Sequence, residues 1–182
     1  MALQFTTSYL EDALATFRMY KKMAESAIAQ VTDEQLVIPL DDDENSIALI
    51  MKHLAGNFRS RWTDFLTTDG EKPQRNRDSE FVEPPATRAE IMKIWEAGWD
   101  CVFHALEPLT EADLSRTVQI RAENHSVLQA INRNLTHCSY HCGQIVMLAK
   151  HYAHDKWKPL TIPKNKSAEY IQRVASGEAS QR

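Results

Sequence analysis

Residues 134–145 read NLTHCSYHCGQI, and the remainder of the chain can be interpreted as a scaffold for this stretch. The stretch lies in a run, roughly residues 126–154, whose apolar side chains recur at helical spacing. In a helix, His137 and His141 lie above one another on the same face. Two imidazoles in this arrangement can share a metal ion, and a third ligand would complete a site with open coordination positions.

The length and composition of the chain predict one globular, mainly helical domain. Its 182 residues are enough to bury a sizeable core, and 43% of them are hydrophobic. Only 5 glycines and 7 prolines are present, which favours long uninterrupted helices over many short strands. We assign residues 1–165 to this domain and residues 166–182 to a polar C-terminal tail, with no internal repeat and no second domain.

Charge and hydropathy argue against several classes of partner. The net charge of −4 argues against nucleic acid as the main partner, because binding to phosphates requires a basic surface. No apolar stretch reaches the length of a transmembrane helix, and no basic amphipathic tract indicates attachment to a membrane. The N-terminus lacks the apolar core of a signal peptide. Three cysteines, an odd number, do not fit a disulfide framework, so we expect the reducing cytoplasm.

Apolar periodicity predicts four long amphipathic helices, which would form a bundle. They cover residues 6–30, 46–66, 88–107 and 126–154. Residues 32–45 are acidic, and we interpret them as a solvated loop because the glycine and closing glutamate of a calcium-binding loop are missing. Residues 67–86 form a long loop of the kind that is usually functional or mobile. Residues 117–121 can form one arm of a small hairpin.

The second predicted helix supplies a third histidine. His53, Asn57 and Arg61 lie at positions i, i+4 and i+8 and form a polar stripe beside the apolar face of that helix. Helix bundles often build metal sites from side chains on facing helices, which makes His53 the natural partner of His137 and His141. The remaining histidines lie at or near helix ends: His104, His125, His151 and His154.

The His-x-x-x-His spacing alone is a weak signal for a metal site. The alternative is a pair of partly buried histidines whose nitrogens are satisfied by hydrogen bonds. A zinc protease of the His-Glu type is excluded, because Cys138 stands where that motif has glutamate. Cys138 and Cys142 lie on the apolar stripe, and we expect them in the core, although thiols can also bind metal.

Arg61 is a second candidate functional residue, with Asn57 one turn before it. A guanidinium can hold a substrate carboxylate through two hydrogen bonds. From the sequence, a structural salt bridge explains Arg61 equally well. We interpret three other arginines, Arg59, Arg75 and Arg77, as solvated or as anchors of a loop.

Two segments together resemble the DinB/YfiT-like superfamily, in a branch of unknown function. They are residues 45–73, NSIALIMKHLAGNFRSRWTDFLTTDGEKP, and the pattern H-x-x-x-H-x-x-Q at residues 137–144. The resemblance covers nearly the whole chain. It implies an all-α, up-down-down-up four-helix bundle with a long crossover loop between helices 2 and 3, and frequent homodimers. It also implies a divalent metal ion, zinc or nickel, on His53, His137 and His141.

Relatives in this superfamily include thiol S-transferases and metal-dependent hydrolases. We therefore expect a metal-dependent enzyme of the thiol S-transferase type, in which the cation favours the thiolate of a low-molecular-weight thiol. Asn57 and Arg61 would be the catalytic residues that position a small-molecule electrophile. A metal-dependent hydrolase is the first alternative, and a non-catalytic metal-binding or ligand-binding dimer is the second.

Overall fold

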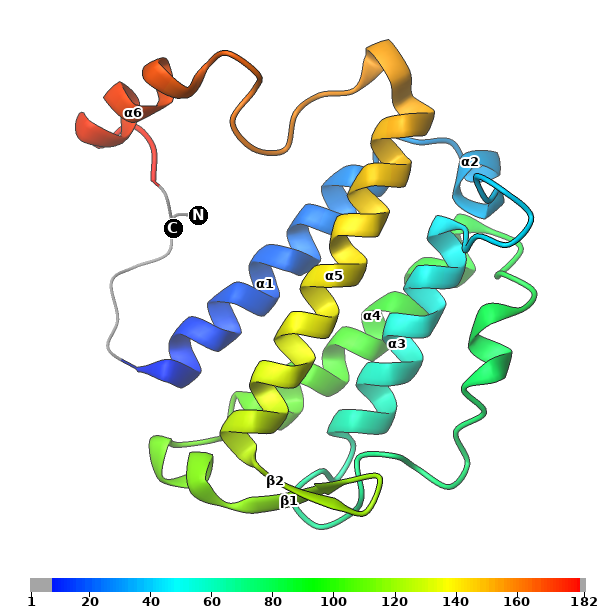
Figure 1. The fold of residues 1–182 in the computed structure, drawn as a ribbon, viewed down its shortest axis with the longest axis vertical. Helices are drawn as coiled ribbons and strands as arrows, with labels where there is room; N and C mark the ends of the chain where they lie inside the picture. The colour runs from blue at the N-terminus through cyan, green and yellow to red at the C-terminus, as the bar shows by residue number, and fades with distance from the viewer. Residues whose placement is uncertain (1–7, 181–182) are drawn as a thin grey trace.

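Four long helices dominate the computed structural model, which describes residues 8–180 (Figure 1). They are α1 (Tyr9–Ile28), α3 (Ile47–Trp62), α4 (Arg88–Leu106) and α5 (Val127–Ala153). In Figure 1, α1 and α5 lie side by side and run upward, whereas α3 and α4 run downward. The all-α, up-down-down-up bundle predicted from the sequence is confirmed.

Shorter elements connect the long helices. They are α2 (Asp33–Val37), η1 (Asp78–Phe81), η2 (Glu111–Ser115), β1 (Thr117–Ile120), β2 (Glu123–Ser126), η3 (His154–Lys156) and α6 (Ser167–Ala175). The two strands pair antiparallel, with Thr117 opposite Ser126 and Ile120 opposite Glu123. The predicted hairpin arm is therefore confirmed, and the hairpin lies at the end of the bundle where α3 ends and α5 begins (Figure 1).

Side-chain caps explain where the helices begin. Each of the four long helices is preceded by a hydroxyl side chain that accepts a hydrogen bond from a first-turn N–H. These residues are Ser8, Ser46, Thr87 and Ser126. The predicted start of the first helix at residue 6 lies outside the described residues.

Two predicted boundaries were wrong. Residues 32–45 are not a continuous loop, because Thr32 and Gln35 form a capping box that starts α2. The second long helix ends at Trp62 instead of residue 66. Its backbone leaves the helix there, since Thr63 is extended and Asp64 adopts a positive φ of 48°.

The core lies between the four helices and is rich in tryptophan. Trp95 and Trp99 of α4 are fully buried, and the Trp99 ring lies 4.7 Å from the ring of Phe58 on α3. Most residues of α3 are buried as well, including the polar residues His53, Asn57 and Arg61. The central helix is therefore held on several sides, which makes it a rigid support for the side chains it carries.

The crossover between α3 and α4, residues 63–87, is tied to the rest of the molecule at both of its ends. Lys52 Nζ donates a hydrogen bond to the Ser79 carbonyl (2.7 Å). At the other end, the Asp69 carboxylate accepts the backbone N–H of Ala122 in the hairpin (2.6 Å). These contacts fix a segment whose sequence carries no periodic pattern.

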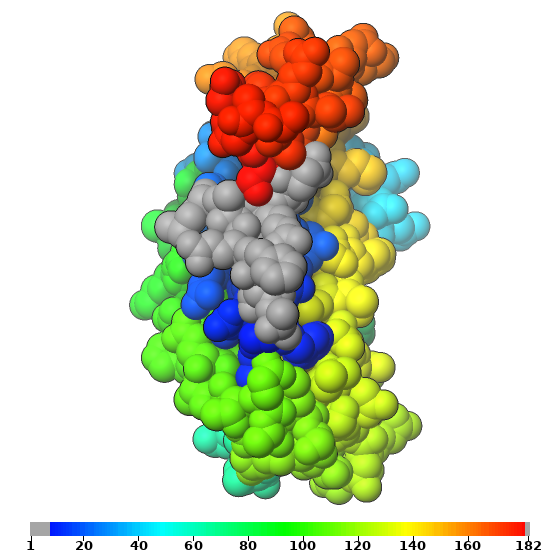
Figure 2. Space-filling view, turned by 90° about the vertical axis from the view of Figure 1, so that its left-hand side faces the viewer, coloured from blue at the N-terminus to red at the C-terminus, as the bar shows by residue number. Residues whose placement is uncertain are grey.

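The C-terminal segment leaves the bundle after α5. Helix α6 lies apart from the four long helices, at one end of the molecule (Figures 1 and 2), and none of its residues is buried. The division between a domain of residues 1–165 and a tail of residues 166–182 stays a prediction. None of the helices within residues 8–180 has the length and apolar composition that a membrane crossing demands.

Candidate metal centre

Three histidines from two helices converge on one point. His53 projects from α3, and His137 and His141 project from α5. The Nε2 atom of His137 lies 3.2 Å from that of His53 and 3.1 Å from that of His141. One nitrogen from each of the three rings lies within 4.8 Å of the others. The structure thus brings together the three residues selected from the sequence, and their role as metal ligands stays a prediction.

Hydrogen bonds fix the tautomer of two of these rings. His53 Nδ1 lies 2.8 Å from a carboxylate oxygen of Glu80, and His141 Nδ1 lies 2.7 Å from the amide oxygen of Gln144. Both oxygens are acceptors, so each Nδ1 carries the hydrogen and each Nε2 presents a lone pair. His137 Nδ1 is buried and has no hydrogen-bond partner among the described residues.

This arrangement fits a metal ion. Hydrogen bonding between the rings cannot satisfy all three Nε2 atoms, because a hydrogen on His137 Nε2 can be donated fully to only one of two lone pairs. A cation accepts all three lone pairs. Nitrogen ligands of tetrahedral zinc lie about 3.3 Å apart, close to the two spacings that His137 Nε2 makes with the other rings. Imidazole ligands suit zinc or nickel and do not suit magnesium or calcium.

Burial keeps two of the candidate ligands neutral. Burial, together with the charges of the neighbouring histidines and of Arg61 and Arg75, lowers the pKa of His137 to about 3. Burial also lowers the pKa of His141 to about 4, although the hydrogen bond to Gln144 opposes it. Both rings are neutral at pH 7, which is the protonation state that a metal ligand requires.

Glu80 in η1 is the buried carboxylate behind His53. Besides the contact with His53, it receives hydrogen bonds from Arg75 Nε (2.8 Å) and Nη2 (2.9 Å). Burial raises its pKa, but the bonds from His53 and Arg75 outweigh burial, so the pKa lies below its usual value. A carboxylate that accepts the Nδ1–H of a histidine is a common outer partner in metal sites, where it orients the ring and raises its basicity.

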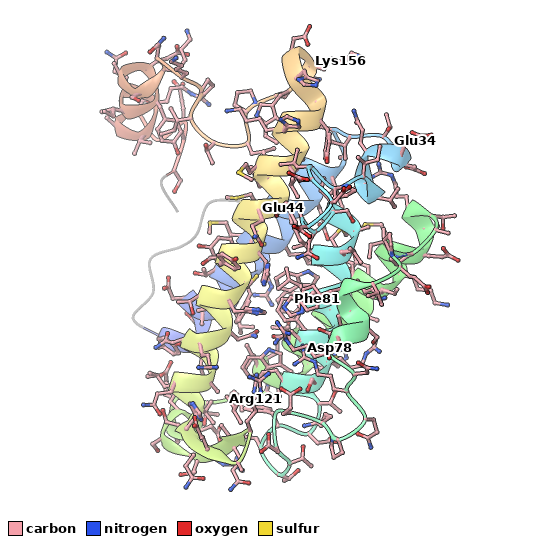
Figure 3. The ribbon with its side chains drawn as sticks, turned by 45° about the vertical axis from the view of Figure 1, so that its right-hand side comes forward. Glu34, Glu44, Asp78, Phe81, Arg121 and Lys156 are labelled. Carbon is pink, nitrogen blue, oxygen red and sulfur yellow. The ribbon has the colours of Figure 1, made fainter. Side chains whose placement is uncertain are left out.

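A glycine allows η1 to approach α3 so closely. A Cβ atom at Gly56 would lie 2.4 Å from Glu80 Oε1, so a larger residue there would displace the carboxylate. Phe81 of the same η1 turn lies over His53, with ring centroids 4.6 Å apart, and Figure 3 shows Phe81 and Asp78 beside α3.

Sequence reasoning missed Glu80 and the role of Arg75. A glycine inside a helix costs about 1 kcal/mol in stability relative to alanine. The available signal of a close neighbour was therefore Gly56, which stands three residues after His53. The expectation that Arg75 anchors a loop agrees with its ion pair to Glu80.

Beside the histidines lies a pocket of about 450 Å³ that contains both predicted catalytic residues. Asn57 lines it, but its side-chain oxygen already accepts a hydrogen bond from Asn134 (2.9 Å), which in turn binds Trp62. Arg61 lines it as well. It is only 7% exposed and forms no ion pair with any residue between 8 and 180, so the salt-bridge interpretation is wrong.

Other candidates lie away from this point. Cys138 and Cys142 are fully buried in the core, as predicted, with their sulfur atoms 3.8 Å apart. Their hydrogen bond and burial raise the pKa of Cys138, so it is not a thiolate. A larger cavity of about 940 Å³ lies between α3, the crossover and Ile94 of α4, and none of the three histidines lines it.

Comparison with known proteins gives a family and a fold. A family model described as "Protein of unknown function (DUF1572)" matches residues 4–166. The comparison with curated proteins gave no match. Among solved structures, YfiT from Bacillus subtilis is similar with a TM-score of 0.59 at 17% identity, over 81% of this chain and 90% of that one. That structure is described as "a probable metal-dependent hydrolase with an unusual four-helix bundle topology". The likeness confirms the DinB/YfiT-like fold.

Proposed function

This chain belongs to the DUF1572 family of proteins of unknown function, and we propose that it is a metal-dependent hydrolase of a small-molecule substrate. The observation that carries the proposal is the convergence of three Nε2 atoms beside a pocket that His53 and His137 line. The description of YfiT as a probable metal-dependent hydrolase supports it, since the two proteins share a fold. When bound, a divalent cation such as zinc or nickel supplies Lewis acidity, which polarises a substrate oxygen and acidifies a bound nucleophile.

The residues of the chain would divide the remaining work. His53, His137 and His141 would hold the cation, while Glu80 and Gln144 keep the rings in the required tautomer. Asn57 and Arg61 lie on the pocket wall within one and two helical turns of His53, where they would orient the substrate. Because α3 is buried in the core, these side chains start from a fixed backbone.

Thiol S-transfer is the second candidate, with a low-molecular-weight thiol as co-substrate. One observation favours it: within residues 8–180, no aspartate or glutamate lines the pocket, so its strong bases in that part of the chain are histidines. A thiol that ionises on a cation needs no separate base, because the charge stabilises the thiolate.

We further propose a homodimer in a reducing compartment. Tyr140 and Met147 are large apolar side chains on α5 and are 61% and 59% exposed, which supports an interface. All three cysteines are free, as expected in a reducing setting.

Metal content tests the site directly. We expect about one zinc or nickel ion per chain after loading, measured by elemental analysis, and its loss in His137→Ala. His104→Ala is the control, because His104 is an exposed residue at the end of α4. A loaded wild type without metal, or a His137→Ala variant that keeps it, would remove the metal site and leave the ligand-binding alternative.

Turnover then separates the two reactions. Hydrolysis of ester, amide or phosphoester probes by the metal-loaded protein without any thiol supports the hydrolase and excludes an obligatory thiol. Turnover only in the presence of a thiol would support the transferase. Metal without either activity would favour a non-catalytic binding protein.

A further inference from the structure

The pocket beside the histidines is lined by five arginines, in a chain whose net charge is −4. They come from α3, the crossover, the hairpin turn and α5, so segments far apart in the sequence contribute positive charge to one place. The five are Arg61, Arg75, Arg77, Arg121 and Arg133.

Nearby carboxylates neutralise only part of this charge. Glu80 and Glu71 pair with Arg75, and Glu71 also pairs with Arg121 at 3.0 Å. The other three arginines form no ion pair with a carboxylate within residues 8–180: Arg61, Arg77 and Arg133. Glu71 and Asp69 also act electrostatically on Arg61, but neither forms an ion pair with it. Three of the five guanidinium groups therefore have no ion-pair partner among the described residues, which leaves an excess of positive charge at the pocket.

Arg61 shows that this excess is built into the fold. The residue is only 7% exposed, and its Nη1 atom has no hydrogen-bond partner among the described residues. Burial lowers its pKa to about 10, the charge of Glu71 opposes this, and the charges of Arg133, Arg75 and Arg121 add to it, so Arg61 remains charged at pH 7. A buried, unpaired cation is unfavourable unless an anion approaches it.

Three of the five arginines, Arg61, Arg121 and Arg133, lie toward the hairpin end of the bundle. On α3, Arg61 follows His53 by eight residues, which is about 12 Å of helix, and α3 runs toward the hairpin (Figure 1). On α5, which runs away from the hairpin, Arg133 precedes His137 by four residues, or about 6 Å. Arg121 belongs to the hairpin turn itself (Figure 3).

We propose that this pocket binds an oxyanion, a carboxylate or a phosphate group, at its hairpin end. On the proposed function, the substrate is then an anionic small molecule whose charged group lies about one to two helical turns from the bond that reacts at the histidines. Guanidinium groups suit this role because they bind carboxylate or phosphate oxygens in pairs.

Calorimetric titration of the full-length protein tests the proposal. The probes are inorganic phosphate and malonate, each added at constant ionic strength against chloride. We expect at least one of them to bind, and Arg133→Gln to weaken it about ten-fold, the loss of roughly one charge-assisted hydrogen bond. Arg133 is exposed and unpaired, so its replacement leaves the core intact. Arg173→Gln, an exposed arginine on α6, is the matched control and should bind as the wild type does.

His137→Ala separates this site from the metal site. Binding of phosphate or malonate should persist in that variant, because the arginines do not depend on the three histidines. Loss of binding there would mean that the anion sits on the metal, and would overturn the proposal, as would binding of neither probe or an unchanged affinity in Arg133→Gln. If the protein binds an anion but no metal, the result supports the oxyanion site and contradicts only the proposed hydrolase function.

Discussion

At the scale of single residues, Glu80 connects a candidate metal ligand, His53, with an arginine of the crossover, Arg75. One of its oxygens accepts hydrogen bonds from His53 and from Arg75, and the other accepts a second bond from Arg75. The side chains of Glu80 and Arg75 are 8% and 5% exposed, so removal of either one would leave the other as a buried charge without this ion-pair partner. Breaking a buried pair by removing one partner costs about 3–5 kcal/mol. The same carboxylate therefore serves both the stability of the crossover and the orientation of His53.

We expect Glu80→Gln to weaken metal binding about 10- to 100-fold, the usual effect of altering an outer partner of a ligand. Glutamine keeps the size of the side chain and an acceptor for His53, but it removes the charge that pairs with Arg75. Metal affinity would be measured by competition with a chelator, and the fold by circular dichroism. Glu83→Gln, exposed in the same crossover, is the control. Equal affinity in wild type and Glu80→Gln would mean that His53 is oriented without this carboxylate.

At the scale of elements, the crossover is part of the candidate site. Its η1 turn supplies Glu80 and Phe81, which contact His53 on α3. The approach of η1 to α3 depends on a single missing methyl group at Gly56, because a Cβ there would overlap the Glu80 carboxylate. A loop with no periodic sequence is thus held by one glycine, one ion pair and backbone contacts to its neighbours.

Gly56→Ala should displace η1 from α3. We expect a loss of roughly 1–3 kcal/mol in the free energy of unfolding, typical of overpacking, together with weaker metal binding. Gly143→Ala is a matched control on α5, since a Cβ there meets no atom within 4 Å. That change should raise stability by up to about 1 kcal/mol through helix propensity alone. Thermal melting and metal titration would check both variants, and identical behaviour would contradict the close packing of η1.

At the scale of the whole molecule, the same bundle is built from different residues in two proteins. YfiT and this chain share the fold over 81% of this chain at only 17% identity. What the two chains share is the arrangement of four helices, which depends on apolar periodicity more than on particular side chains. The arginines that line the pocket come from segments of this chain that the fold brings together.

Removal of residues 166–182 should leave the bundle unchanged, because α6 contributes no buried residue. We expect the same melting temperature and the same metal content as in the full-length protein, measured by calorimetry and elemental analysis. A melting temperature lower by several degrees would show that the tail belongs to the folded domain, and would contradict the boundary predicted at residue 165.

The sequence by itself determined the parts of this protein that depend on near neighbours along the chain. Apolar spacing predicted the four long helices and the faces that they bury, and the structure shows a hydroxyl cap such as Thr87 or Ser126 before each of them. The alignment of His137 with His141 required only the geometry of one helix turn. Bundle packing then made His53 the natural third member, and the structure places it beside the other two.

Only the tertiary structure decided what the crossover contributes. Glu80 contacts His53 across 27 residues of sequence, and Arg77 reaches the same pocket from a segment that has no periodicity. The path of such a segment depends on contacts with distant residues, as when Asp69 binds the hairpin, and those contacts do not exist until the helices have packed. Local spacing therefore predicted the pair His137 and His141, and the expected bundle added His53. The carboxylate behind these histidines and the arginines around the pocket depended on how the chain folds back on itself.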